Sequence, residues 1–195
     1  MVEKKRVAIL IIDDVEVLDF AGPFEVFSVT NEVNGYGLME IFTVSGEKRE
    51  VRARNGLSVI PHYALGEAPV PDILIIPGGS GTRPLLHDNE VLSWIVTSAQ
   101  GAERVLSVCT GALLLGKAGL LNGLRCTTHH SAFGLLAEIA PESEVLRDAR
   151  FVDEGKVVTS AGISAGIDMS LHVVASLFGK EVAQGTAAYM EYPFP

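Results

Sequence analysis

The sequence contains little cysteine, no long hydrophobic run and no excess of positive charge, and each shortage excludes a class of protein. Only two of its 195 residues are cysteines, which is too few for a disulfide framework, and they lack the paired spacing of a zinc site. A transmembrane helix needs about 20 consecutive apolar residues, and the apolar runs here are far shorter. The formal net charge is −9 and no basic stripe offsets it, so we expect no direct binding to nucleic acid.

What remains is the composition of an ordinary globular protein. Hydrophobic residues make up 48% of the chain and charged residues 20%, and the length suits a single domain over residues 1–195. The apolar run at residues 7–12 is interrupted by Asp13 and Asp14, which makes it too short for an export signal. We therefore expect a cytoplasmic protein with reduced thiols and no membrane association.

Short runs of β-branched residues alternate with helical patterns, which predicts an α/β fold with a mostly parallel central sheet. The runs at residues 7–12, 72–76 and 104–108 are continuously apolar, as expected for central strands that are buried on both faces. Two less regular runs, at residues 41–44 and 57–60, are expected in the outer part of the same sheet. A hairpin is expected where runs at residues 151–152 and 156–160 flank Gly155.

Apolar stripes and terminal signals predict the helices. A first-turn proline at Pro23 indicates one helix start, and Gly101, Gly119 and Gly179 indicate three helix ends. The corresponding three helices are expected at residues 89–101, 111–118 and 164–178.

A predicted buried strand runs directly into a predicted helix at Cys109, in the segment ERVLSVCTGALLLGKAGLL. Unpaired N–H groups and the positive end of the helix dipole favour a thiolate there, so we expect an activated nucleophile with a lowered pKa. Thr110 and Gly111 permit the tight turn. Cysteine is also often a small buried residue with no reactivity, and Cys126 is interpreted in that way.

Two glycines, Gly78 and Gly79, end the strand at residues 72–76. Glycines at a strand's carboxyl end let the backbone approach a ligand and direct N–H groups at an oxyanion or phosphate. The alternative is a simple turn. A dinucleotide site is not expected, because the GxGxxG pattern would need glycine where Arg83 stands. Since the carboxyl ends of parallel strands converge on one crevice, the glycines are expected near Cys109.

The sequence leaves Asp19 and His129 with two interpretations each. Asp19 lies between the first strand and the next helix, where it either caps the helix or faces Cys109 as a proton donor or acceptor. His129 follows the strand after the cysteine helix and is either a structural residue or part of the site. No metal-ligand spacing is visible, and we expect no metal.

Four segments together carry a resemblance to a known family: LDFAGPFEVF, IIPGGSGTRPLL, SVCTGALLLGKAGLLNGLRCTTHH and TSAGISAGIDMSLHVV. The chain resembles the ThiJ/PfpI superfamily, which is related to class I glutamine amidotransferases. Within it, the chain is most similar to isocyanide hydratases and to the amidase-like domains of AraC-type regulators. The resemblance implies a flavodoxin-like three-layer sandwich with the cysteine at a strand-to-helix nucleophile elbow, and a homodimer.

The resemblance also implies roles for individual residues. Cys109 matches the nucleophile, Asp19 the acid, and Thr110 the threonine that follows the nucleophile. The backbone N–H groups of Gly79 and Thr110 would lie beside the reacting centre. The residues implied to contact a small-molecule substrate are Gly78, Gly79, His129 and Ile163.

The expected function is therefore hydration of an isocyanide to an N-substituted formamide by covalent cysteine catalysis, without a metal or organic cofactor. One alternative is a ligand- or redox-sensing module without turnover. Another is a glyoxalase- or deglycase-type activity, although those subgroups carry glutamate at the position of Asp19. A peptidase is disfavoured because Thr110 stands where that subgroup has histidine.

Overall fold

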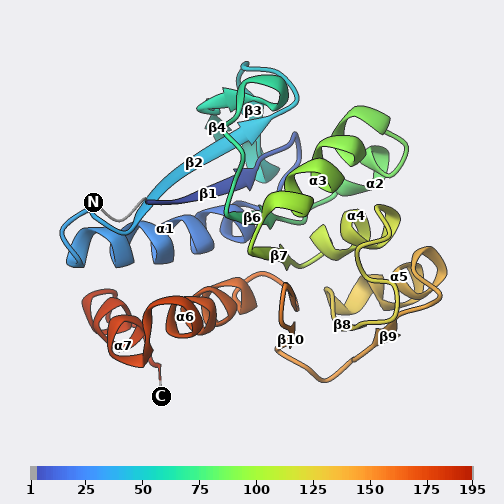
Figure 1. Cartoon of the computed structure of the whole chain (residues 1–195). Helices are drawn as coiled ribbons and strands as arrows, with labels where there is room; N and C mark the ends of the chain where they lie inside the picture. Colours follow the sequence, from blue (N-terminus) through green and yellow to red (C-terminus); the bar gives the residue numbers. More distant parts are fainter. Residues whose placement is uncertain (1–3, 195) are drawn as a thin grey trace.

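The computed structural model describes residues 4–194 and has three layers, a seven-stranded sheet with helices on both faces (Figure 1). The strand order is β10-β11-β7-β6-β1-β2-β5, and every neighbouring pair is parallel except β10 with β11. The strands are β1 (Lys5–Leu10), β2 (Met39–Ser45), β5 (Tyr63–Ala64), β6 (Ile73–Ile76), β7 (Arg104–Val108), β10 (Phe151–Glu154) and β11 (Val157–Ser160). The predicted α/β fold, its mostly parallel sheet and the hairpin of β10 and β11 at one edge of the sheet are confirmed.

The helices form two groups, one on each face of the sheet (Figure 1). Helices α1 (Val17–Val33), α6 (Ala165–Phe178) and α7 (Lys180–Tyr189) pack on one another. The other group comprises α2 (Thr82–Leu85), α3 (Asn89–Gly101), α4 (Gly111–Lys117) and α5 (Phe133–Ile139), and each of the other three contacts α4. None of the helices within residues 4–194 is long and apolar enough to span a membrane.

The central strands β1, β6 and β7 bring three loops to one edge of the sheet. Their apolar residues are almost fully buried, as their continuous hydrophobicity predicted. In the register, Val7 pairs with Ile73 and Ile73 pairs with Arg104. Because the three strands are parallel, the segments that follow them all leave at the carboxyl edge.

Two sequence predictions are wrong. The run at residues 57–60 does not join the main sheet, because β4 (Ser58–Val59) pairs with β3 (Val51–Arg52) in a separate small sheet, and Ile60 is 72% exposed. Pro23 does not begin a helix but lies inside α1, which starts six residues earlier. In that position it cannot donate a backbone hydrogen bond. A second small sheet pairs β8 (Arg125–Cys126) with β9 (Glu144–Val145).

Candidate active site

Cys109 occupies a sharp turn between β7 and α4, as predicted. Its φ is +56°, a left-handed conformation that costs a residue with a side chain about 1–2 kcal/mol. Backbone bonds hold it there, because the Cys109 N–H donates to the carbonyls of Ser160 and Ala161 at 3.2 and 3.1 Å. The Thr128 hydroxyl donates to the Cys109 carbonyl at 2.7 Å. Strained residues of this kind concentrate at functional sites.

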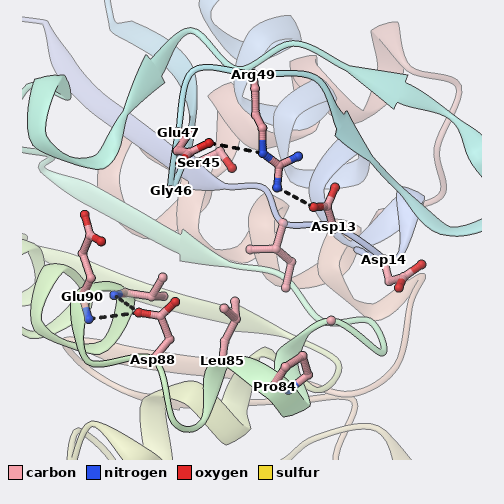
Figure 2. Close-up of a pocket in the computed structure, with 13 residues that line it drawn as sticks. Asp13, Asp14, Ser45, Gly46, Glu47, Arg49, Pro84, Leu85, Asp88 and Glu90 are labelled. Carbon is pink, nitrogen blue, oxygen red and sulfur yellow. Dashed lines mark hydrogen bonds and ion pairs between the residues drawn. The ribbon is translucent and has the colours of Figure 1, made fainter.

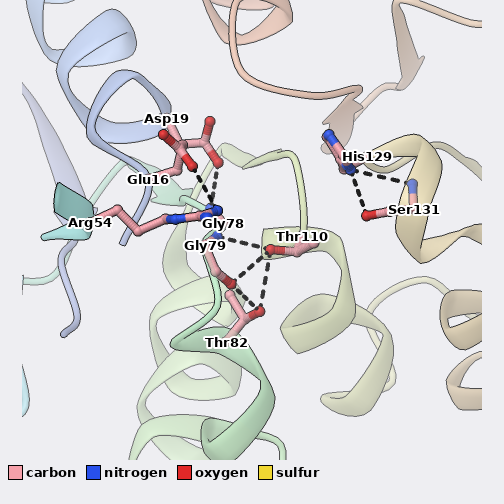
Figure 3. A network of polar contacts seen from close by, with 9 residues as sticks. All are labelled: Glu16, Asp19, Arg54, Gly78, Gly79, Thr82, Thr110, His129 and Ser131. Atoms are coloured by element: carbon pink, nitrogen blue, oxygen red, sulfur yellow. Dashed lines mark hydrogen bonds and ion pairs between the residues drawn. The ribbon is translucent and has the colours of Figure 1, made fainter. Parts of the chain in front are cut away.

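The loop after β6 packs so closely against Cys109's neighbours that only glycine fits at position 78. A Cβ there would lie 2.5 Å from the Thr110 nitrogen and 2.9 Å from Asp19 Oδ2. Gly78 N–H donates to Asp19 Oδ2 at 3.0 Å, and Gly79 N–H donates to Thr110 Oγ1 at 2.9 Å (Figure 3). The two N–H groups therefore hold the acid and the turn together. Both N–H groups have partners within the chain, and a contact of Gly78 or Gly79 with a substrate stays a prediction.

Asp19 is a fully buried carboxyl in the first turn of α1. The capping interpretation is wrong, because Glu16 occupies the N-cap position and Asp19 is inside the helix. Its Oδ1 is buried and forms no hydrogen bond within residues 4–194. Burial raises the pKa of Asp19 to about 7, although hydrogen bonds from the Gly78 N–H and the Cys109 thiol lower it. Near neutral pH the carboxyl can therefore hold a proton or release it.

The thiol of Cys109 is not the low-pKa thiolate that the helix terminus suggested. Burial, and next the neighbouring charge of Asp19, raise its pKa to about 12, while the backbone N–H groups of Thr110 and Ile163 lower it. The side chain is only 6% exposed, and desolvation outweighs the end of a seven-residue helix. The thiol lowers the pKa of Asp19 and the carboxyl raises the pKa of Cys109, so the two groups titrate as a coupled pair.

His129 forms a wall of the site as a neutral ring. Its Nδ1 lies 2.8 Å from Ser131 Oγ and accepts the Ser131 backbone N–H at 3.3 Å (Figure 3). This bond assigns the ring proton to Nε2. Burial, and then the charge of His130, lower the pKa of His129. The ring packs against the backbone of Gly162, where a Cβ would lie 2.3 Å from Cδ2.

A cavity of about 250 Å³ lies beside Cys109. Its lining residues are Glu16, Arg54, Gly79, Ser80, Arg83, Cys109, Thr110, His129, Ser131 and Ile163. Of the site residues that the sequence suggested, five line this cavity, and Gly78 and Asp19 adjoin it without lining it.

Sequence reasoning missed several residues of this cavity, notably Glu16, Arg54 and Arg83. Arg83 lies in α2, shortly after the carboxyl end of β6, and this position was the signal that could have identified it. Within residues 4–194, no group of three or more His, Cys, Asp or Glu side chains could hold a metal ion.

Comparisons with known proteins identify a family and several relatives. The family described as the DJ-1/PfpI family matches residues 5–176. An isonitrile hydratase of Pseudomonas putida is 35% identical over 190 residues, which cover 96% of this chain and 78% of that protein. The crystal structure of a ThiJ/PfpI family protein from Pseudomonas syringae superposes with a TM-score of 0.88 and 31% identity, covering 99% of this chain and 77% of the other.

A transcriptional regulator is also similar. The HTH-type regulator GbdR of Pseudomonas aeruginosa is 27% identical over 188 residues, which cover 96% of this chain. The chain spans about half the length of that regulator, 51%.

Proposed function

This chain belongs to the DJ-1/PfpI family, and from that premise we propose that it hydrates an isocyanide to an N-substituted formamide. The observation that carries the proposal is the pairing of the buried Asp19 carboxyl with the Cys109 thiol at the elbow. The 35% identity to an isonitrile hydratase supports it, since isonitrile is another word for isocyanide.

The first step uses the pair with one proton removed. Asp19 loses this proton first, because its pKa of about 7 lies below the thiol pKa of about 12. The reactive form arises when the Cys109 proton passes to the Asp19 carboxylate and leaves the negative charge on sulfur, where the N–H groups of Thr110 and Ile163 lower the thiol pKa. The sulfur attacks the terminal carbon of R–N≡C while Asp19 gives its proton to that carbon. The product is a thioimidate, R–N=CH–S–Cys109, and Asp19 is left as a carboxylate.

The second step returns the site to its starting state. Water adds to the thioimidate carbon, and one of its protons returns to the Asp19 carboxylate. The other proton ends on nitrogen, and the carbon–sulfur bond breaks. Release of R–NH–CHO leaves the proton on Asp19 and the charge on Cys109, so no oxidant, reductant or metal enters the balance.

A ligand-sensing role is the second candidate, and similarity to a regulator favours it. The same pocket would then bind a small molecule without turnover. The redox variant of this candidate would use the same Cys109 thiolate as the hydration, and it differs in that peroxide oxidises the sulfur without substrate turnover.

The proposal is tested by incubating the protein with a panel containing a small isocyanide, a dicarbonyl and a peptide. We expect the formyl proton of an N-substituted formamide in the NMR spectrum of the isocyanide sample, and intact-mass spectrometry should detect a thioimidate adduct on Cys109. Turnover of the dicarbonyl alone would replace the proposal with a glyoxalase-type activity. Binding without turnover would favour the sensor.

We also propose a homodimer. The C-terminal Tyr192 and Phe194 pack back onto the core and are partly buried within the chain. Large apolar side chains remain exposed near the ends of α1 and α7, where Val33, Tyr36 and Tyr189 are 40%, 58% and 60% exposed, and such surfaces often mark interfaces.

Light scattering at micromolar concentration should give about 42 kDa, twice the chain mass of 20.8 kDa. Tyr189→Glu places a second carboxylate beside Glu32, with which the Tyr189 hydroxyl forms a hydrogen bond, and should shift the mass toward the monomer. A wild-type mass of about 21 kDa would contradict the dimer, and a dimer unaffected by this variant would place the interface elsewhere.

A further inference from the structure

The charges around the Cys109 cavity are not typical of this acidic protein. Two arginines and one glutamate line it, whereas the whole chain has a net charge of −9. Arg54 lies 3.3 Å from Glu16 (Figure 3), so these two charges largely cancel. The Arg83 side chain forms no hydrogen bond or ion pair within residues 4–194 and is exposed at the rim.

The other groups of the cavity leave the Arg83 charge uncompensated. His129 has a lowered pKa, caused first by burial, and the charge of Arg83 contributes to it, so the ring is neutral. Ser80 and Ser131 carry no charge. Apart from the reacting pair, the walls of the cavity therefore present one net positive charge.

A larger hollow nearby has the opposite character. It measures about 530 Å³, and its wall carries carboxylates including Asp14, Asp88 and Glu90 (Figure 2). The arginine that lines it, Arg49, is engaged by Asp13 at 2.7 Å and by Glu47 at 3.5 Å (Figure 2). The Cys109 cavity therefore contains an arginine without a neutralising partner, whereas the arginine of the larger hollow is neutralised.

We infer that the Cys109 cavity accepts a small isocyanide that carries a carboxylate, and that Arg83 binds this carboxylate and thereby sets substrate specificity. This inference rests on the proposed hydration. A guanidinium matches a carboxylate with two parallel N–H donors. The pairing also has an electrostatic role, because the reacting pair carries one negative charge and an unpaired substrate anion would oppose its formation.

The size of the cavity limits the substrate further. A water molecule takes up about 30 Å³ in the liquid, so 250 Å³ corresponds to about eight waters. Isocyanoacetate has six non-hydrogen atoms and is small enough for this space.

The first test compares two alkylating agents of equal shape, iodoacetate and iodoacetamide. Each forms a bond from Cys109 sulfur to carbon with loss of iodide and of the thiol proton, and neither requires isocyanide turnover. The rate with iodoacetate is divided by the rate with iodoacetamide, both for Cys109 and for N-acetylcysteine amide as a reference thiol. In the wild type this ratio should be about tenfold higher for Cys109 than for the reference thiol. Arg83→Met should remove this preference, Arg83→Lys should retain part of it, and 0.5 M KCl should weaken it.

Arg49→Met is the matched control, because it removes the same charge from the neighbouring hollow. It should leave the ratio unchanged. A wild-type ratio equal to that of the reference thiol, or an equal loss in Arg83→Met and Arg49→Met, would overturn the assignment of Arg83.

The second test measures hydration of isocyanoacetate and of its methyl ester. Arg83→Met should lower kcat/KM for the anion about tenfold and leave the ester within about twofold. If only the ester is hydrated, the inference is wrong and the proposed function stands. If neither is hydrated while iodoacetate is still preferred through Arg83, the proposed function fails and the anion site stands.

Discussion

Cys109→Ser is expected to reduce kcat/KM for isocyanide hydration by at least about 10³-fold and to leave the fold intact. Serine has nearly the same size and can adopt the same turn, where φ is +56°. A serine hydroxyl is a far weaker nucleophile than sulfur unless a base activates it, and Asp19 serves here as the proton donor to carbon. Formamide production followed by NMR measures the loss, and circular dichroism with thermal unfolding measures the fold.

Cys126→Ala is the matched control for this experiment. Cys126 is fully buried at the end of β8 and does not line the Cys109 cavity. The variant should lose some stability, because a buried side chain is shortened, but its kcat/KM should remain within about twofold of wild type. A serine variant that hydrates isocyanides at the wild-type rate would show that Cys109 is not the nucleophile.

Asp19→Asn is expected to lower kcat/KM by about 10²- to 10³-fold and at the same time to stabilise the protein at pH 8. The loss follows from removal of the proton donor, since positioned acid catalysis contributes about 10²- to 10⁴-fold. The gain follows from burial, because asparagine retains an oxygen for the Gly78 N–H but never carries a charge. Steady-state kinetics and urea unfolding measure the two effects.

The pH dependence of stability has a definite sign. The pKa of Asp19 is about 7 in the folded protein against an ordinary 3.8, so the folded state binds this proton more tightly than the unfolded state. The resulting stabilisation is fully present below about pH 4 and is lost as the pH rises through about 7. The difference in pKa corresponds to at most about 4 kcal/mol of folding stability. When the pH is raised from 4 to 8, the free energy of unfolding of Asp19→Asn should therefore increase by about 2–4 kcal/mol relative to that of the wild type.

The same proton governs the rate profile. The reactive pair has lost one proton, so the wild-type kcat/KM should rise with pH up to about 7, the pKa of Asp19, and then level off. The asparagine variant should lack this break. Glu40→Gln, which removes an exposed carboxylate on β2, should change neither profile. An asparagine variant with wild-type turnover, or one that is less stable at pH 8, would contradict the role assigned to Asp19.

The sequence by itself determined the architecture and the position of Cys109 at the elbow, because both depend on local patterns. Continuously apolar runs give strands that are buried on both faces, and β1, β6 and β7 are such strands. A strand that meets a helix without a linker forces a sharp turn, and this placed Cys109 correctly. Parallel strands share one carboxyl edge, which brought the loop after β6 to the cysteine.

Local patterns failed where burial decides the outcome. Asp19 has the signature of a helix cap, yet it lies inside α1 and is fully buried. The helix terminus at Cys109 predicted a lowered pKa, but desolvation and the facing carboxyl raise it to about 12. Neither the degree of burial nor the facing group can be read from neighbours in the chain, since both come from elements distant in sequence.

The charge of the cavity is also a tertiary property. Arg54 follows β3 and Arg83 lies in α2, and only the folded chain brings both to the cavity with Cys109. The sequence supplied both residues among 15 lysines and arginines, with nothing to distinguish them from Arg49. Packing decided which arginine is neutralised and which is left free, because Coulomb interactions depend on the distance in space and not on the separation along the chain.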